Sequence, residues 1–232
     1  MIHTATDISR ILALPQWPYE PTDGLVEKWS TALQRHPNRR PLRPIQAMVC
    51  ERASQLLAAA PTQPYGLFLP IGVGHGKTLV SMLLGRLYNA KRPLLIVPPD
   101  AVADSTTFML DWSRDYIFPR PHIIGYSKLS SPKASGLLER LSPDLIVLDE
   151  AHSLKRKSAA RTKRMQRYMT AHPQTRVVVE SGTLTKKSIM DYAHLMEWSI
   201  RGMSVLPLSW PLLELWSAVL DVNGIPDEAA LA

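Results

Sequence analysis

Short apolar runs alternate with longer amphipathic segments through the middle of the chain. The runs with the length and branched residues of buried strands lie at 66–70, 93–97, 122–126, 145–148 and 176–180. Segments long enough for helices lie at 77–89, 101–115, 134–141 and 159–170. Such alternation, with connections of a few residues, is typical of a mainly parallel sheet covered by helices on both faces. The pattern therefore predicts an α/β fold.

The two ends of the chain follow other patterns. Residues 1–41 are broken by repeated prolines and leave room for one short helix, from about 24 to 34. Pro44 suits the first turn of a helix that runs to about residue 60. Residues 191–200 predict a further helix, and 206–220 are apolar and rich in tryptophan. This last segment either packs onto the sheet or presents a surface to a partner.

These patterns divide the chain into three parts. We expect an irregular or helical extension over 1–41, a central domain over 42–200 and a helical tail over 201–232.

Length and composition suit one large domain with a buried core. Of the 232 residues, 45% are hydrophobic and 20% are charged, as in ordinary globular proteins. No stretch approaches the roughly 18 consecutive apolar residues that cross a bilayer, and the first residues lack a basic region followed by an apolar one. We expect no membrane partner, no secretion, and a location in the cytoplasm, nucleoid or nucleus. The single cysteine, Cys50, excludes an internal disulfide and a cysteine-based zinc cluster, and its apolar neighbours predict a buried structural thiol.

Positive charge is concentrated in one region. The formal net charge of +7 favours a polyanionic partner. Residues 153–179 contain no acidic residue but hold Lys155, Arg156, Lys157, Arg161, Lys163, Arg164, Arg167 and Arg176. Such a run is either a solvated helix face or a contact surface for nucleic acid, and both interpretations stay open.

A glycine-rich segment joins the first expected strand to the helix that follows it. Its residues are Ile71, Gly72, Val73, Gly74, His75, Gly76, Lys77 and Thr78. Glycines let backbone N–H groups turn toward nucleotide phosphates, and a helix N-terminus favours anions. In the pattern G-x-x-x-x-G-K-[ST] the lysine binds the β- and γ-phosphates and the threonine hydroxyl binds Mg²⁺. Ile71 stands where that pattern has glycine, and we expect Gly72 and Gly74 to compensate. An ordinary glycine-rich turn is the alternative.

A second segment supplies the carboxylates that such a site needs. The apolar run 145–148 delivers Asp149 and Glu150 at its C-terminal end, the edge of a parallel sheet where open α/β folds bind ligands. An aspartate there can hold Mg²⁺ and a glutamate can orient or deprotonate the attacking water. Capping of the next helix would explain one acid but not the pair. The two segments together predict a Mg²⁺–nucleotide site.

These residues carry a family resemblance. Asp149-Glu150-Ala151-His152 is a DEAH box, and the chain resembles the first RecA-like lobe of a superfamily-two helicase or translocase, a phosphate-loop domain. The weaker matches, in the family's order, are a glutamine motif at 42–46, a segment after the second strand at 96–99, a Tyr-x-x-Leu element at 125–129 and a Ser/Thr-Gly-Thr motif at 181–185. The run from His152 to Lys155 is similar to the Swi/Snf-type DNA translocases. The resemblance covers about residues 42 to 196, and Leu184 departs from it, because Swi/Snf-type members usually have proline there.

The resemblance implies a role for each matching residue. Lys77 and Glu150 would be catalytic, and Thr78 with Asp149 would hold Mg²⁺. Gln46 would read the adenine edge of ATP, with Arg43 nearby. His152, Ser181 and Thr183 would couple the nucleotide state to the nucleic-acid face. The alternatives are a solvent-facing Gln46, a core aromatic at Tyr126 and a plain strand-end turn at 181–183.

The basic segment predicts an amphipathic helix. At helical spacing Lys157, Arg161, Arg164 and Tyr168 share one face, and Thr162, Met165 and Met169 share another. With Lys155, the cationic face suits backbone phosphates, so we expect binding that is salt-sensitive and independent of sequence, with duplex DNA as the partner.

Members of the resembled family hydrolyse ATP between two RecA-like lobes, the second of which supplies an arginine finger. The chain ends about fifty residues after its Ser-Gly-Thr motif, so we expect a fragment of a longer protein or half of a split translocase rather than a stand-alone module. The leading hypothesis is the ATP-binding lobe of a DNA helicase or translocase, a weak ATPase alone. The alternative is a non-catalytic adaptor or inhibitor that keeps the fold to bind nucleic acid or a helicase. A phosphate-loop enzyme such as a nucleotide kinase would need a substrate-phosphate site, for which the sequence offers no candidate.

Overall fold

The computed structural model describes residues 2–14, 24–37, 39–72, 74–182 and 188–221. Val73, Thr183 and Leu184 lie outside the described residues. The strands are β1 (Leu67–Leu69), β2 (Pro93–Val97), β3 (His122–Gly125), β4 (Leu145–Leu148) and β5 (Arg176–Glu180). Each matches an expected strand to within one residue at either end.

The strands form one parallel sheet in the order β1-β5-β4-β2-β3. The strand before the glycine-rich segment, β1, and the strand before the two carboxylates, β4, are therefore not neighbours. Strand β5, the last in the sequence, lies between them. The prediction of a mainly parallel sheet in an α/β fold is confirmed.

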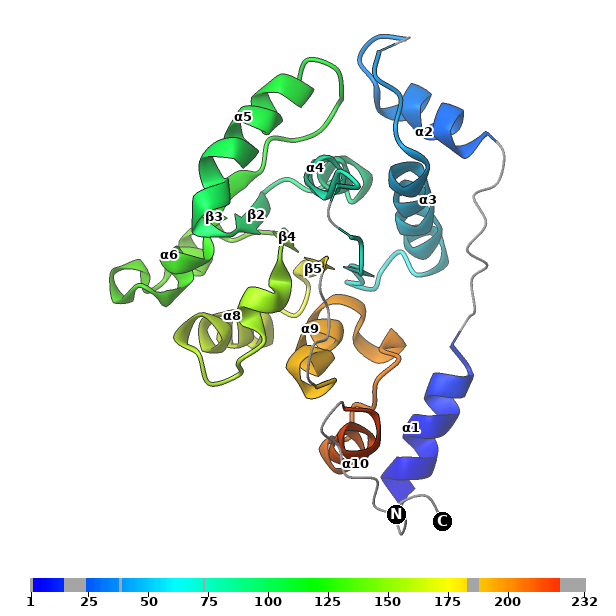
Figure 1. Cartoon of the computed structure of the whole chain (residues 1–232), viewed down its shortest axis with the longest axis vertical. Coiled ribbons are helices and arrows are strands. Elements are labelled where there is room, and N and C mark those ends of the chain that lie inside the picture. The colour runs from blue at the N-terminus through cyan, green and yellow to red at the C-terminus, as the bar shows by residue number, and fades with distance from the viewer. Residues whose placement is uncertain (1, 15–23, 38, 73, 183–187, 222–232) are drawn as a thin grey trace.

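Alternate residues of each strand point to opposite faces and build two separate cores. In β2, Leu95 and Val97 join one core and Leu94 and Ile96 join the other. Figure 1 shows the sheet between two layers of helices. Because both faces are covered, the strands are mostly apolar, with polar residues only at strand ends.

The helices divide between these faces. One face carries α2 (Leu25–Leu33), α3 (Pro44–Ala59), α4 (Lys77–Leu87) and α5 (Val102–Trp112). The other carries α6 (Tyr126–Ser130), α7 (Leu137–Leu141), α8 (Ala160–Ala171) and α9 (Met190–Ile200). Short 3₁₀ turns are η1 (Pro99–Ala101), η2 (Pro132–Ala134), η3 (Ala151–Leu154) and η4 (Arg201–Met203). The expected helices are present, with α4, α5 and α7 shorter than predicted.

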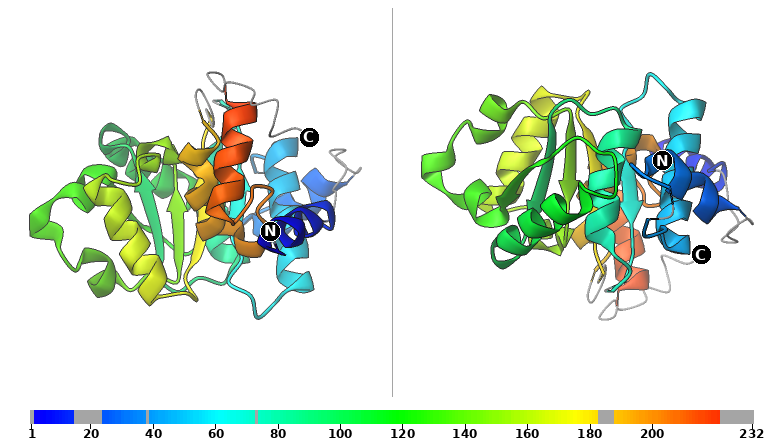
Figure 2. Two further views of the ribbon diagram at one scale, coloured as in Figure 1. Left: turned by 90° about the horizontal axis from the view of Figure 1, so that it is seen from below. Right: turned by 90° about the horizontal axis from the view of Figure 1, so that it is seen from above.

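The two ends of the described chain meet. Helix α1 (Ile2–Leu12), for which the sequence pattern gave no expectation, lies beside α10 (Trp210–Leu220) in all three views of Figures 1 and 2. Helix α10 packs against α9, which lies between it and the sheet in Figure 1. The tail therefore packs on a helix, where Leu212 and Leu213 are buried, while Trp210 keeps 46% and Leu220 60% of its surface exposed.

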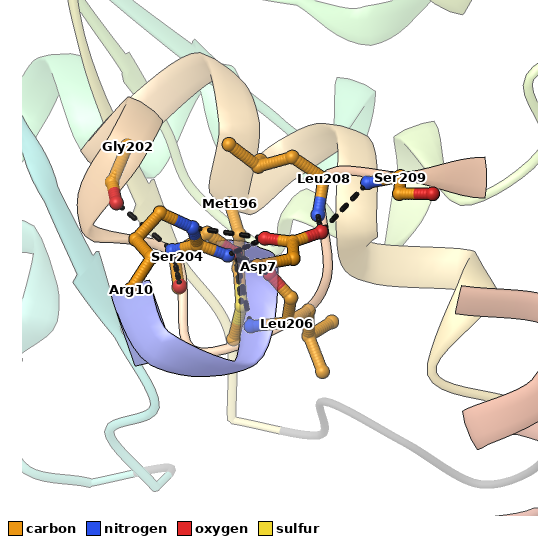
Figure 3. A network of polar contacts seen from close by, with 8 residues as sticks. All are labelled: Asp7, Arg10, Met196, Gly202, Ser204, Leu206, Leu208 and Ser209. Carbon is orange, nitrogen blue, oxygen red and sulfur yellow. Dashed lines mark hydrogen bonds and ion pairs between the residues drawn. The ribbon is translucent and has the colours of Figure 1, made fainter. Parts of the chain in front are cut away.

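A polar network joins these ends, as Figure 3 shows. The Asp7 carboxylate accepts hydrogen bonds from the backbone N–H groups of Leu208, at 2.8 Å, and Ser209, at 2.9 Å. Arg10 pairs with Asp7 at 2.7 Å and donates to backbone carbonyls of residues 202, 204 and 206. Residues at opposite ends of the sequence thus fix the start of α10.

Cys50 lies in α3 with no exposed surface, so the prediction of a buried thiol is confirmed. Burial raises the pKa of this thiol to about 12. Within the described segments, no helix combines the length and apolarity that a bilayer crossing requires.

Candidate functional site

The glycine-rich segment forms a tight loop ahead of α4. Gly74 and Gly76 adopt positive φ, at 85° and 74°, which residues with a Cβ rarely do. A Cβ at Gly76 would also lie 2.4 Å from the side-chain nitrogen of Gln46. The N-cap of α4 is Gly76, which has no side chain to cap the helix. A helix N-terminus of this kind leaves backbone N–H groups whose hydrogen bonds phosphate oxygens can accept. Gly72 and His75 are exposed and Thr78, in the first turn, is half-buried.

Lys77 begins α4 and is nearly buried, with 8% of its surface exposed. Its ammonium donates to the backbone carbonyl of Ile71, at 3.2 Å, and pairs with the Glu150 carboxylate, also at 3.2 Å. The Ile71 side chain packs into the core. Ile71, which stands in place of the glycine of the pattern, thus anchors the loop to the core through its side chain. Its backbone carbonyl accepts the hydrogen bond from Lys77.

Gln46 braces the loop from α3. It is only 4% exposed, so the alternative of a solvent-facing residue is wrong. Its amide donates to the backbone carbonyl of Gly76 at 3.2 Å, while its carbonyl accepts the backbone N–H of Arg43 at 2.8 Å. The Arg43 guanidinium donates to the carbonyl of Gly74. Both residues expected near the adenine therefore contact the loop itself.

The DEAH segment begins where β4 ends, on the same edge of the sheet. The Asp149 carboxylate accepts the backbone N–H of Glu150 at 2.9 Å, and Tyr126 donates its hydroxyl to the Asp149 carbonyl at 2.9 Å. Tyr126 is a fully buried core aromatic, but one with a polar contact to this segment. Burial raises the pKa of Asp149, as does the Glu150 charge, against the opposing charge of Lys77.

Glu150 joins the two segments. The backbone of Glu150 has a positive φ of 48°. Its carboxylate contacts the Lys77 ammonium and, at 3.3 Å, the Nδ1 atom of His152. The predicted catalytic pair and the first predicted coupling residue therefore lie together.

Glu180, which the sequence analysis did not single out, belongs to the same place. It ends β5, is completely buried, and lies 2.7 Å from the Ser81 hydroxyl of α4. The sequence feature that could have identified Glu180 is its position as an acidic residue directly after three valines. Ser181 follows, also buried, and its backbone N–H donates to the Leu69 carbonyl of β1 at 3.2 Å.

The basic segment departs from its expected pattern. Tyr168 is buried with Met165 and Met169, not on an exposed cationic face, and its hydroxyl donates to the Pro143 carbonyl. Helix α8 begins at Ala160, so Lys157 precedes it and instead stacks over the Trp210 ring, 4.0 Å from the centroid.

Two further cations of the predicted set are partly committed to the fold. The Arg164 guanidinium donates to the carbonyls of Lys128, Ser131 and Ala134, and Arg161 is half-buried. Lys155 is exposed, as are Lys163 and Arg167, two basic residues that the facial assignment left out.

A cavity of about 540 Å³ lies along this segment. Lys157, Lys163, Arg164 and Arg167 line it, together with His194 of α9. None of the described residues in its wall is acidic. The arrangement suits an anionic ligand more than a cationic one.

The comparisons with known proteins bear on the fold. No family model matches the chain, and no curated protein matches it in sequence. Among solved structures, the SWI2/SNF2 ATPase core of Sulfolobus solfataricus in complex with double-stranded DNA matches with a TM-score of 0.52 and 16% identity. The match covers 71% of this chain and 37% of that one. The protein therefore has the α/β fold found in part of a SWI2/SNF2 ATPase core.

Proposed function

We propose that this protein is the ATP-binding lobe of a DNA translocase or helicase. One observation carries the proposal: Lys77 of the glycine-rich loop and Glu150 of the DEAH segment meet at 3.2 Å on the C-terminal edge of a parallel sheet. The loop there is tight, and the helix that follows it has no side-chain cap. These are the features by which a phosphate-loop site receives an anion.

In the proposed reaction the backbone of the loop and the Lys77 ammonium bind the β- and γ-phosphates of ATP. Thr78 and Asp149 would hold Mg²⁺, which neutralises charge on the phosphate oxygens. Glu150 takes a proton from water as the water oxygen attacks the γ-phosphorus. The bond between that phosphorus and the β–γ bridging oxygen breaks, and the bridging oxygen leaves with ADP. Gln46 and Arg43 remain proposed readers of adenine and would exchange loop contacts for it.

Nucleic-acid binding is the second part of the proposal. The cavity along α8, with its four basic residues, supports a contact with backbone phosphates. The likeness to an ATPase core solved with double-stranded DNA supports duplex DNA as the track. His152 and Ser181 are the described residues that would couple the two sites.

We propose that hydrolysis needs a second RecA-like lobe, in a longer chain or as a separate protein. An arginine finger from that lobe would stabilise the transition state, as in other nucleotide hydrolases, where it contributes about 10³–10⁵ in rate. The isolated chain would then bind ATP well and hydrolyse it slowly.

Titration with a fluorescent ATP analogue in the presence of Mg²⁺ tests the proposal. Lys77→Ala should weaken binding by about 10- to 100-fold, since it removes a charged donor from a desolvated site. Lys91→Ala is the matched control, because Lys91 is exposed and precedes β2. It therefore lies at the N-terminal ends of the strands, away from the loop. Absence of binding by the wild-type chain at millimolar nucleotide overturns the proposal. DNA binding that persists unchanged in Lys77→Ala, in a chain that binds no nucleotide, identifies the adaptor instead.

A further inference from the structure

A buried glutamate lies between the two halves of the candidate nucleotide site. Glu180 is the last residue of β5, the strand between β1 and β4. Alternation along β5 places its side chain on the same face as Val178, towards α4. None of its surface is exposed, and Lys77 and Asp149 are near enough to influence its ionisation.

The two contacts of the Ser81 hydroxyl favour one direction for the hydrogen bonds around Glu180. The Ser81 hydroxyl lies 2.7 Å from the Oε2 atom of Glu180 and 3.1 Å from the backbone carbonyl oxygen of Lys77. A serine hydroxyl has one hydrogen and can donate to only one of these oxygens. If Glu180 is protonated, its O–H donates to Ser81, and Ser81 donates to the Lys77 carbonyl. Both contacts are then hydrogen bonds, whereas an ionised Glu180 leaves one of them without a hydrogen.

The charges around Glu180 favour the same state. Its other oxygen, Oε1, has no hydrogen-bond partner among the described residues. Lys77, whose charge would favour an ionised Glu180, is already paired with Glu150. Asp149 and Glu150 oppose ionisation, and Tyr126 is a further titratable group nearby. Burial, reinforced by the Asp149 charge, raises the pKa of Glu180 well above its ordinary value, because an unpaired buried carboxylate costs far more than a neutral acid.

We infer that Glu180 is a positioning residue of the phosphate loop, a hydrogen-bond donor that holds the first turn of α4 through Ser81. The effect on nucleotide binding rests on the proposed function, because the chain of hydrogen bonds ends on the backbone of Lys77. The adjoining Ser181 is bonded to β1. One buried contact thus connects the helix that begins at Lys77 with the segment proposed to couple nucleotide and DNA.

Conservative and disruptive variants separate this role from simple packing. In Glu180→Gln the amide still donates to Ser81, so the affinity for a fluorescent ATP analogue with Mg²⁺ should stay within about twofold of wild type. Ser81→Ala and Glu180→Leu each remove the chain and should weaken binding about fivefold. The double variant should be no weaker than the worse single one, because both remove the same interaction. Equal damage by Glu180→Gln and Glu180→Leu overturns the inference.

A nucleotide-free measurement keeps the inference separate from the proposed function. The folded protein holds the Glu180 proton while the unfolded chain loses it above the ordinary value of 4.5. The wild type should therefore lose thermal stability relative to Glu180→Gln as the pH rises from about 5 to about 8. A difference in midpoint that does not change with pH shows an ionised Glu180 and overturns the inference. Failure of the wild type to bind Mg²⁺–ATP overturns the proposed function alone.

Discussion

Glu150 contacts the Lys77 ammonium and the His152 ring, and this determines what its removal should do. In Glu150→Gln the Lys77 ammonium loses the counter-ion that lies 3.2 Å away and becomes free for phosphate. We expect Mg²⁺–ATP binding to be kept or tightened while hydrolysis falls by about 10²-fold or more, because the proposed proton acceptor is gone. Binding titration and single-turnover hydrolysis on the same preparation measure both. Glu139→Gln, at an exposed acid in α7, is the control. A loss of binding as large as that in Lys77→Ala would instead make Glu150 a structural support of the loop.

His194 should make the protein sensitive to mild acid. It is 4% exposed, its Nε2 atom lies 3.0 Å from the Leu154 carbonyl, and burial lowers its pKa from 6.5 to about 4. Near pH 6 the His194 side chain therefore binds a proton in the unfolded chain but not in the folded protein. The contribution of neutral His194 to the free energy of unfolding is present above pH 6.5 and is lost as the pH falls. Between about pH 7.5 and pH 5 the loss should be about 2 kcal/mol.

Urea unfolding of wild type and His194→Gln at these two pH values checks the sign. Glu180 changes stability in the opposite direction over this range, but it is common to both proteins and cancels in the comparison. An equal loss in the two proteins would show that other groups cause the acid sensitivity.

The sequence predicts the residues whose chemistry is local. Two motifs of recognisable spacing contain the predicted site residues Lys77, Thr78, Asp149 and Glu150. No sequence motif predicts that Gln46 bonds to the loop or that Glu180 lies beneath it. Both depend on contacts between segments that are far apart in the sequence.

At the scale of elements, α1 and α10 stabilise each other through Asp7. Burial by itself raises the pKa of Asp7, but the Ser209 N–H group and Arg10 outweigh it and lower the pKa. The carboxylate also lies at the N-terminus of α10, where negative charge is favourable. Asp7→Ala should lower the free energy of unfolding by about 1–3 kcal/mol, because it leaves two partly buried backbone N–H groups and Arg10 without their acceptor.

Thermal unfolding compared with that of Asp104→Ala, an exposed acid in α5, measures this effect. Limited proteolysis should cut the variant first near α1 and α10. Unchanged stability in Asp7→Ala would mean that α1 is held by its other contacts.

Element boundaries follow the sequence pattern where the period is strong. The runs 93–97, 145–148 and 176–180 coincide with strands because both faces of the sheet are covered, and every residue in them except Arg176 is buried. In α8 the cationic periodicity was misleading. Tyr168 has a polar hydroxyl that finds the Pro143 carbonyl, so its ring can be buried with the methionines.

At the scale of the whole molecule, the basic surface along α8 predicts salt-dependent DNA binding. Lys163→Glu/Arg167→Glu should weaken binding to a short duplex about 10- to 100-fold and reduce the slope of log affinity against log salt by about two. Arg86→Glu/Lys91→Glu makes the same charge change at exposed positions at the C-terminal end of α4 and just before β2. Equal effects of the two variants would mean that net charge alone, not this surface, governs binding.

The proposed division of labour between lobes can be measured directly. Addition of a separately purified second RecA-like lobe and duplex DNA should raise hydrolysis by about 10³-fold or more, through an arginine finger. Lys77→Ala should abolish the stimulated rate. Full activity of the isolated chain would show that it needs no second lobe.

The sequence by itself determined the alternation of strands and helices, the glycine-rich loop and the carboxylates of the DEAH segment, because hydrophobic period and motif spacing are properties of neighbouring residues. Only the tertiary structure decided the strand order, because parallel pairing joins segments that are distant in the chain. That order places β5 between β1 and β4. It therefore brings Glu180, the end of an otherwise unremarked strand, beneath the loop, and it joins Asp7 to a helix two hundred residues away.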